Sequence, residues 1–554
     1  MPHQKYRAFE PIALPDRQWP DNRIIEAPRW CSVDLRDGNQ ALVEPMNPVE
    51  KHKMWDLLVE IGFKEIEVGF PAASQTDFEF VRKIIEEDLI PDDLTIQVLC
   101  QARKELIERT CEAVSGASNV IFHLYNSTST LQRKVVFDMS QAEVIQLATD
   151  ATKLVKENTK KLRDEGTRVI LEYSPESYTA TEMDFAIEIC SEVLNEWDAS
   201  EKEKIILNLP STVEMATPNV YADQIEYFIR NLPGRNKAII SLHTHNDRGT
   251  GIAASELGLM AGAERVEGTL FGNGERTGNL DIITMAMNMF SQGIDPNLYL
   301  GDMPKIVSVS EECTKIPIHV RQPYAGELVF TAFSGSHQDA IKKGMHLVST
   351  GSDNFWEVPY LPIDPNDVGS SYRETVRVNS QSGKGGVAFV LEHHFGVTLP
   401  RALLLEFSPV VQGLSEAGGG ELKPEEMWNA FKKEYIDVNG PYRLIEYKLG
   451  AASPEIEICN GLIQVSENEL RINGRGSGPI AAFVDALVKT LNEPLNVVEY
   501  QEYALNEGSQ ARAICILCME DESKNRYYGV GVSKNTNRAA FESIISSLNR
   551  KWIK

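Results

Sequence analysis

The sequence carries a pair of histidines, His243 and His245, at a spacing that suits metal binding. They end a run of apolar and β-branched residues, and on a strand residues two apart point to the same face. An isolated H-x-H pair is more often structural, but Asp37 and Asn279 follow other strand-like runs at matching positions. Two imidazoles, a carboxylate and an amide carbonyl form a mixed nitrogen and oxygen set compatible with Zn²⁺, Mn²⁺ or hydrated Mg²⁺.

Arg36 precedes Asp37 in the segment RDGNQ. A guanidinium beside a metal ion can polarise a ketone and stabilise the oxyanion or enolate that forms on it. These residue types therefore favour an enzyme that makes or breaks a carbon–carbon bond.

The elements that must position these side chains are eight short strand-like runs separated by segments with helical periodicity. One of the helical segments begins with Asn47 as N-cap and Pro48 in the first turn. Strands that alternate with helices indicate parallel βαβ units, and eight units in about 250 residues predict an α/β protein with a closed (β/α)₈ TIM barrel. An open doubly wound sheet is the alternative, because periodicity does not reveal closure. The runs are 30–35, 65–70, 94–99, 119–124, 168–173, 204–209, 238–243 and 265–270.

Further polar residues lie in or after the middle strands of this predicted barrel. His123 lies within the fourth run, Glu176 follows the fifth and Thr212 follows the sixth. Because catalytic groups of such barrels lie on the loops after the strands, we expect these side chains at the same mouth as the histidine pair.

The sequence predicts three parts. Residues 1–300 form the barrel with an N-terminal extension, and residues 301–420 form a helical and extended region with Pro- and Gly-rich turns. Glycines 418–420 are the predicted linker to a final α+β domain, 421–554. This domain repeats the triplet Ala-Ala-Phe at 481–483 and 539–541. A true duplication predicts a pseudo-symmetric domain with a cleft between its halves, and chance similarity is the alternative.

The composition excludes several classes of protein. The 554 residues carry a formal charge of −25, so binding to nucleic acid or to an anionic membrane surface is not expected. Eight scattered cysteines do not form a disulfide framework, and neither a signal peptide nor a membrane span is evident. We therefore expect a cytoplasmic protein.

Three other patterns are interpreted as structural. The glycines at 272, 274 and 278 have the wrong spacing for a dinucleotide-binding fingerprint, and Ser336 to Asp339 contain the residue types of a catalytic triad only as sequence neighbours. We expect both segments to be loops. Cys515 and Cys518 lie in an apolar run and are expected to face opposite sides of a strand in the core.

Several longer segments together resemble the 2-isopropylmalate synthase family in its longer form, and the resemblance covers almost the whole chain. The motifs around His245 and Asp37 are shared with a wider group of condensing enzymes, whereas the segments around His337 and Tyr360 are more specific. The segments are DLRDGNQAL (34–42), YSPESYT (173–179), LPSTVEMATP (209–218), SLHTHNDRGTG (241–251), GNGERTGN (272–279), SGSHQDA (334–340), VPYLPIDPNDVG (358–369) and VRVNSQSGKGG (376–386).

The resemblance implies an acyltransferase that condenses acetyl-CoA with 3-methyl-2-oxobutanoate and hydrolyses the thioester. The products would be 2-isopropylmalate and CoA, in the first committed step of leucine biosynthesis. A sister enzyme acting on pyruvate or 2-oxoglutarate (a citramalate or homocitrate synthase), a metal-dependent lyase of the same barrel type and a catalytically silent leucine sensor are the alternatives.

The resemblance also implies roles for individual residues. The divalent-metal ligands would be Asp37, His243, His245 and Asn279, with Mg²⁺ as the expected metal and Mn²⁺ or Zn²⁺ as alternatives. Arg36 would stabilise charge on the keto oxygen, and His123 and Thr212 would line the keto-acid site. The group implicated in deprotonating the acetyl methyl and activating water would be Glu176, His337 and Tyr360, with the choice of base left open.

His337 lies outside the barrel segment, and in the family such residues reach the site from a partner subunit. The resemblance therefore implies a homodimer with composite sites. It also implies that L-leucine binds the C-terminal domain as an inhibitor, near Gly474, Gly476, Gly478 and Ala481. A tight glycine-rich connection at a helix N-terminus is the alternative interpretation of that segment.

Overall fold

The structure is a computed structural model that describes residues 3–332, 334–350, 355–370, 384–418, 422–505 and 511–553. The chain divides into two compact units. The first comprises Met1–Val329 and Ile363–Ser370, and the second Phe330–Pro362 and Ser371–Lys554. Of the predicted glycine linker, Gly418 is the last residue of a helix, whereas 419 and 420 lie outside the described residues, as does most of the VRVNSQSGKGG segment.

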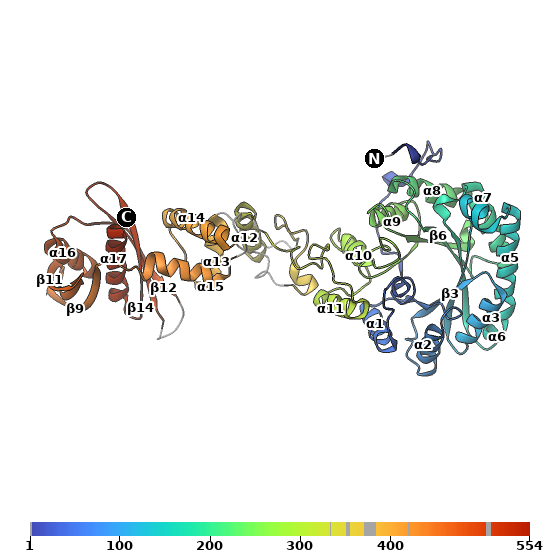
Figure 1. Ribbon diagram of the computed structural model, residues 1–554, viewed down its shortest axis with the longest axis horizontal. Helices are drawn as coiled ribbons and strands as arrows, with labels where there is room; N and C mark the ends of the chain where they lie inside the picture. Colours follow the sequence, from blue (N-terminus) through green and yellow to red (C-terminus); the bar gives the residue numbers. More distant parts are fainter. Residues whose placement is uncertain are drawn as a thin grey trace. The chain divides into compact units, whose positions relative to one another are not determined.

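The first unit contains a closed barrel of eight parallel strands in sequential order, which confirms the predicted TIM barrel. Figure 1 shows the helices arranged around these strands. The strands are β1 (Arg29–Ser32), β2 (Glu65–Gly69), β3 (Thr95–Gln101), β4 (Asn119–Ser127), β5 (Arg168–Glu176), β6 (Ile205–Ser211), β7 (Ala238–Thr244) and β8 (Arg265–Gly268). β8 pairs with β1 through four residue pairs, from Arg29 with Arg265 to Ser32 with Gly268, and thereby closes the barrel.

The helices of the first unit connect the strands and cover the outside of the barrel. They are α1 (Pro48–Ile61), α2 (Gln75–Glu86), α3 (Lys104–Ala113), α4 (Thr130–Gln132), α5 (Gln141–Asn158), α6 (Lys160–Asp164), α7 (Met183–Trp197), α8 (Pro218–Asn231), α9 (Gly251–Met260), α10 (Ile282–Phe290) and α11 (Met303–Thr314). As predicted, Asn47 caps α1, and its side chain and that of Glu50 form a reciprocal capping box. Strands β6 and β7 are buried along their whole length, as expected where helices cover one face and the barrel interior the other.

The second unit begins with four helices, α12 (Gly335–Thr350), α13 (Lys384–Phe395), α14 (Arg401–Gly418) and α15 (Pro424–Phe431). The prediction that Ser336 to Asp339 form a loop is wrong, because these residues lie in the first turn of α12. The Gln338 N–H donates to the Ser334 carbonyl at 3.0 Å, which starts the helical hydrogen bonding there. Four consecutive polar residues do not reveal a helix start when no apolar period accompanies them.

The C-terminal part of the second unit repeats one arrangement, three antiparallel strands followed by a helix. The first set is β9 (Tyr442–Ser453), β10 (Ile456–Val465), β11 (Asn468–Gly476) and α16 (Pro479–Leu491). The second set is β12 (Asn496–Ala504), β13 (Ala513–Glu520), β14 (Arg526–Ser533) and α17 (Thr536–Ile553). Phe483 and Phe541, which end the repeated triplets, stack with ring centroids 4.2 Å apart. The 58-residue repeat therefore corresponds to a repeated structural unit.

Cys515 and Cys518 are both buried on β13 but belong to different apolar clusters, as predicted for opposite faces of one strand. Among the helices in the described residues, none combines the length and the apolar character required to cross a membrane.

Candidate active site

A cavity of 290 Å³ lies at the end of the barrel where the strands finish. Most of the predicted site residues line it, namely Arg36, Asp37, His123, Glu176, Thr212, His243 and His245. The remaining lining residues were not predicted from the sequence; they are Gln40, Leu99, Tyr125, Ser174, Asn208, Pro210, Glu275 and Arg276. The barrel thus brings together side chains from several strands, as expected for a site built on βα loops.

A single π-helical turn, Asp34–Gly38, places Arg36 and Asp37 directly after β1. Asp34 fixes the turn, since its carboxylate accepts hydrogen bonds from the hydroxyl of Ser32 at 2.8 Å and from the backbone N–H of Leu270 at 3.1 Å. π-Helical turns are rare and occur frequently at functional sites. Here the turn directs a guanidinium and a carboxylate toward the barrel axis from adjacent positions.

Asp37, His243 and His245 form a compact ligand set in which one atom from each lies within 4.8 Å of the others. Oδ2 of Asp37 lies 3.3 Å from Nε2 of His243 and 3.9 Å from Nε2 of His245. The Asn279 amide nitrogen donates to the same Oδ2 at 2.8 Å, whereas its buried Oδ1 has no hydrogen-bond partner in the described part of the chain. An unpartnered carbonyl oxygen beside a carboxylate and two imidazoles fits a divalent cation.

The loop that carries Asn279 requires glycine. Gly278 has φ +100°, and a Cβ atom there would lie 2.0 Å from the Gly272 carbonyl oxygen. In this conformation the Asn279 N–H donates to the same carbonyl at 2.9 Å, and Asn279 forms an isolated bridge with His245. The glycines at 272 and 278 therefore serve the geometry of the site, and they lie in a loop as predicted.

The ionisable groups of this set influence one another strongly. Burial alone would raise the pKa of Asp37, but the charge of Arg36 and contacts with His243 hold it below its usual range. Burial opposes protonation of His243, yet hydrogen bonds to Asp37 and Glu267 raise its pKa to about 9. Burial and the charge of His243 lower the pKa of His245 to about 4. Asp37 is thus a carboxylate and His245 a neutral imidazole at pH 7, the forms that bind a cation.

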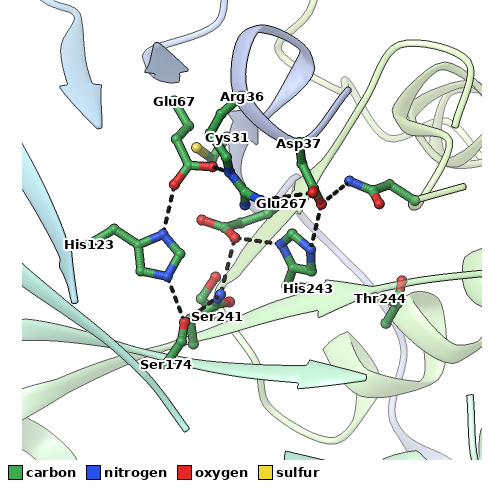
Figure 2. A network of polar contacts seen from close by, with 12 residues as sticks. Cys31, Arg36, Asp37, Glu67, His123, Ser174, Ser241, His243, Thr244 and Glu267 are labelled. Carbon is green, nitrogen blue, oxygen red and sulfur yellow. Dashed lines mark hydrogen bonds and ion pairs between the residues drawn. The ribbon is translucent and has the colours of Figure 1, made fainter. Parts of the chain in front are cut away.

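Arg36 bridges the ligand set to the opposite side of the cavity. Its Nη1 lies 2.8 Å from Oδ1 of Asp37, and its Nε hydrogen-bonds Glu67 on β2. Glu67 also contacts Nδ1 of His123 at 2.7 Å, and Nε2 of His123 lies 2.7 Å from the Ser174 hydroxyl. Figure 2 shows Arg36 between Asp37 and Glu67, with His123 facing Glu67 on one side and Ser174 on the other. Because the network pairs the Arg36 guanidinium with the carboxylates of Asp37 and Glu67, it fixes the orientation of the guanidinium.

Glu176 and Thr212 lie at the ends of the neighbouring strands β5 and β6. The carboxylate of Glu176 accepts a hydrogen bond from Ser127, and Oγ1 of Thr212 accepts one from the backbone N–H of Ser177 at 2.9 Å. Both residues line the cavity. Glu176 contributes a carboxylate to its wall, and Thr212 contributes a side chain with a hydroxyl and a methyl group.

His337 and Tyr360 belong to the second unit, where their rings stack with centroids 3.9 Å apart and planes at 24°. Tyr360 is 61% exposed and has φ +67°, a backbone conformation that a bulky residue rarely adopts. An imidazole and a phenol therefore form one pair at a strained position.

The predicted regulatory residues fall into two groups. Gly474 and Gly476 lie on β11 against α16, where a Cβ would approach the helix backbone to 2.3 Å and 2.5 Å, so these glycines permit close packing of helix on sheet. Gly478 and Ala481 line a hollow of 580 Å³ at the start of α16. The other residues that line the hollow are Ser477, Pro479, Ile480, Val484, Asp485, Leu495, Asn496 and Val497.

Three buried carboxylates of the barrel interior were not predicted from the sequence. Glu67, Glu172 and Glu267 lie within strands β2, β5 and β8 and are at most 1% exposed. Each directly follows a buried apolar residue within its strand (Ile66, Leu171 and Val266), and a charged residue at such a position is the signal that could have identified them.

Family models match most of the chain. They are HMGL-like over residues 27–310, "alpha-isopropylmalate synthase, post-catalytic domain-like" over 327–392 and "LeuA allosteric (dimerisation) domain" over 421–552. The chain is 52% identical to a 2-isopropylmalate synthase of Rhodospirillum rubrum over 99% of this chain and 98% of that protein. It is 51% identical to a 2-isopropylmalate synthase of Clostridium acetobutylicum over the full length of both.

Strand order, cavity residues and full-length similarity agree, and on these grounds the chain belongs to the 2-isopropylmalate synthase family.

Proposed function

We propose that the protein condenses acetyl-CoA with 3-methyl-2-oxobutanoate in the cytoplasm and releases 2-isopropylmalate and CoA. The observation that carries the proposal is the convergence of Arg36, Asp37, His243 and His245 on one cavity. Family membership supports the substrates, since the relatives that share the full length of this chain are named 2-isopropylmalate synthases.

Asp37, His243, His245 and Asn279 would hold a divalent cation, with Mg²⁺ as the proposed metal. A cation bound there supplies Lewis-acid polarisation of the keto acid's ketone oxygen. The keto acid would occupy the same cavity, and the apolar side chains of Leu99 and Pro210 line it where an isopropyl group needs cover from water.

Arg36 stabilises the negative charge that develops on the ketone oxygen when the carbon–carbon bond forms. Its guanidinium is held by Asp37 and Glu67, so little reorganisation is needed as charge appears. His123 and Thr212 border the keto acid, and His123 is fixed in turn by Glu67 and Ser174.

The acetyl methyl must lose a proton before its carbon attacks the ketone. A thioester α-proton is weakly acidic, so the base and the group that stabilises the enolate must act together. We assign this step and the later activation of water to Glu176, His337 and Tyr360. The methyl carbon bonds to the ketone carbon, the resulting alkoxide takes a proton, and water cleaves the thioester to give a carboxylate and CoA.

His337 and Tyr360 are proposed to act on the barrel of the partner subunit in a homodimer. The match to a dimerisation domain over 421–552 supports the dimer. The stacked pair and the unusual backbone of Tyr360 support a functional role, because strained conformations concentrate at functional sites.

L-Leucine is the proposed inhibitor and would bind the hollow beside Gly478 and Ala481. The hollow is lined by apolar side chains and by Asp485, whose carboxylate could receive an ammonium group. The match to an allosteric domain supports a regulatory role for this part of the chain.

The test is CoA release, measured with a thiol reagent, from acetyl-CoA and each of three keto acids. We expect the highest kcat/KM with 3-methyl-2-oxobutanoate. A higher value with pyruvate or 2-oxoglutarate would establish a sister condensing activity. Cleavage of a carbon–carbon bond of a branched hydroxyacyl-CoA, without any condensation, would establish a lyase, and no turnover with any substrate would leave only a sensor role.

A further inference from the structure

Glu267 is a buried carboxylate of β8 that accepts four hydrogen bonds. Oε2 accepts from Nδ1 of His243 at 2.8 Å and from Asn208 at 3.0 Å. Oε1 accepts from Arg265 at 2.9 Å and from Gln97 at 2.8 Å. Figure 2 shows Glu267 beside one ring nitrogen of His243 and Asp37 beside the other. All acceptor positions of the carboxylate are thus used, and one of them is used by a residue of the proposed metal set.

We propose that Arg265 and Glu267 are positioning residues that hold His243 in the ring orientation and tautomer required for metal binding. The inference rests on the metal site of the proposed function. It extends that site to two residues that hold a metal ligand in place and do not themselves bind the metal.

The geometry of His243 carries the argument. An imidazole that donates through Nδ1 presents a lone pair at Nε2 once a cation replaces the proton there, and Nε2 is the atom that lies 3.3 Å from Asp37. A carboxylate partner also raises the basicity of the ring and therefore its strength as a ligand. With Glu267 in place, the ring of His243 has one orientation that satisfies both of its nitrogens.

Arg265 keeps Glu267 in place. It is fully buried, its Nη1 binds Oε1 of Glu267, and its Nε lies 2.5 Å from Oε2 of Glu65. Its Nη2 donates to Gln97 at 2.7 Å, and Gln97 in turn donates to Glu67 at 3.1 Å. The contact with Arg265 fixes Oε1 of Glu267 and thereby the orientation of the carboxylate whose Oε2 faces His243.

Glu172 provides a matched contrast. It is as deeply buried as Glu267 and lies 3.4 Å from the same Arg265, but among the residues that the structure describes no donor hydrogen-bonds to its oxygens. It makes no contact with His243, and its nearest imidazole is His123 at 3.4 Å. Two glutamates of equal size and burial thus differ in whether they hold a metal ligand.

The test is Mn²⁺ affinity of the metal-free full-length protein, measured by the loss of the free-ion electron paramagnetic resonance signal. In Glu267→Gln the amide replaces one acceptor by a donor, so either His243 or Arg265 loses its partner. We expect the Kd for Mn²⁺ to rise by about 10–100-fold, the usual effect of losing such a partner. In Glu172→Gln we expect a Kd close to that of the parent protein.

An unchanged Kd for Mn²⁺ in folded Glu267→Gln would overturn the proposal. An equal rise of the Kd in Glu267→Gln and Glu172→Gln would also overturn it, because it would indicate a general effect of removing a buried carboxylate. If Glu267→Gln does not fold, Glu267→Asp decides the question, since it keeps the charge beside Arg265 but withdraws the oxygen from His243. We expect Glu267→Asp to bind Mn²⁺ more weakly than the parent, and parental affinity would overturn the proposal. If none of the proteins binds Mn²⁺, the metal site itself, and with it the proposed function, is wrong.

Discussion

Oδ2 of Asp37 lies 3.3 Å from Nε2 of His243, and the two residues come from opposite ends of the barrel sequence, one after β1 and one on β7. A carboxylate oxygen and an imidazole nitrogen that face one point, with a second imidazole beside them, are a ligand set that fits a divalent cation.

Removal of divalent metal is expected to abolish CoA release. Dialysis against a chelator should give inactive protein, and added Mg²⁺ or Mn²⁺ should restore turnover. His243→Ala should remain inactive at all metal concentrations, because the ligand set loses one of its two imidazoles. His319→Ala is the control, since His319 is exposed and does not line the cavity. Chelator-resistant turnover would contradict the metal assignment.

Arg36→Lys is expected to lower kcat by about 10²–10³-fold, with the KM for the keto acid changed far less. An ammonium group cannot bind Asp37 and Glu67 and still face a developing oxyanion, because it lacks the planar set of donors. Steady-state kinetics at saturating acetyl-CoA provide the measurement.

The matched control for that substitution is Arg133→Lys. Arg133 is also buried and ion-paired, to Glu182, but it does not line the cavity. If both variants lose the same activity, the effect of Arg36→Lys is one of stability and the oxyanion role is wrong.

The barrel and most of its mouth could be predicted because both depend on local signals. Eight apolar runs define the strands, and the polar residues after them, such as Arg36 and Thr212, mark the catalytic end. Gln97, Glu67 and Glu267 could not be assigned a role in the same way. Their function arises from hydrogen bonds across the barrel interior, between residues up to 170 positions apart.

The helix start at Gly335 was missed for a different reason. No apolar period marks its first turn, and the hydrogen bond from Gln338 to Ser334 appears only in the folded chain. The role of His337 similarly has no local signal, since its sequence neighbours are ordinary polar residues.

Mixed dimers test whether His337 acts on the barrel of the partner subunit. Arg36→Ala and His337→Ala are each expected to be inactive. If they are unfolded together and refolded, half of the dimers combine the two chains, and each of these has one intact composite site. About a quarter of parental activity should return. The control mixture is Arg36→Ala with His243→Ala, which should stay inactive because both changes affect the barrel. No recovery in the first mixture would place both residues in one chain.

Ala481→Phe is expected to abolish inhibition by L-leucine while kcat in its absence is unchanged. The added ring would fill part of the hollow at the start of α16, which Ala481 lines. Inhibition curves over a range of leucine concentrations provide the measurement. Ala451→Phe is the control, because Ala451 is also exposed but lies on β9 and does not line the hollow. Parental inhibition in Ala481→Phe would mean that leucine binds elsewhere.

Asp34 is expected to make the barrel less stable as the pH rises from about 4 to about 6. Burial raises the pKa of this carboxyl to about 6, against about 3.9 in an unfolded chain. In that interval the folded protein holds the proton and the unfolded chain does not, so raising the pH favours unfolding. The difference of about two pKa units corresponds to roughly 2–3 kcal/mol of the free energy of unfolding, and this contribution is lost completely above pH 6.

Asp34→Asn removes this titration and provides the test. The difference in Tm, parent minus variant, should therefore fall as the pH rises from about 4 to about 6. A difference independent of pH would show that Asp34 is ionised throughout.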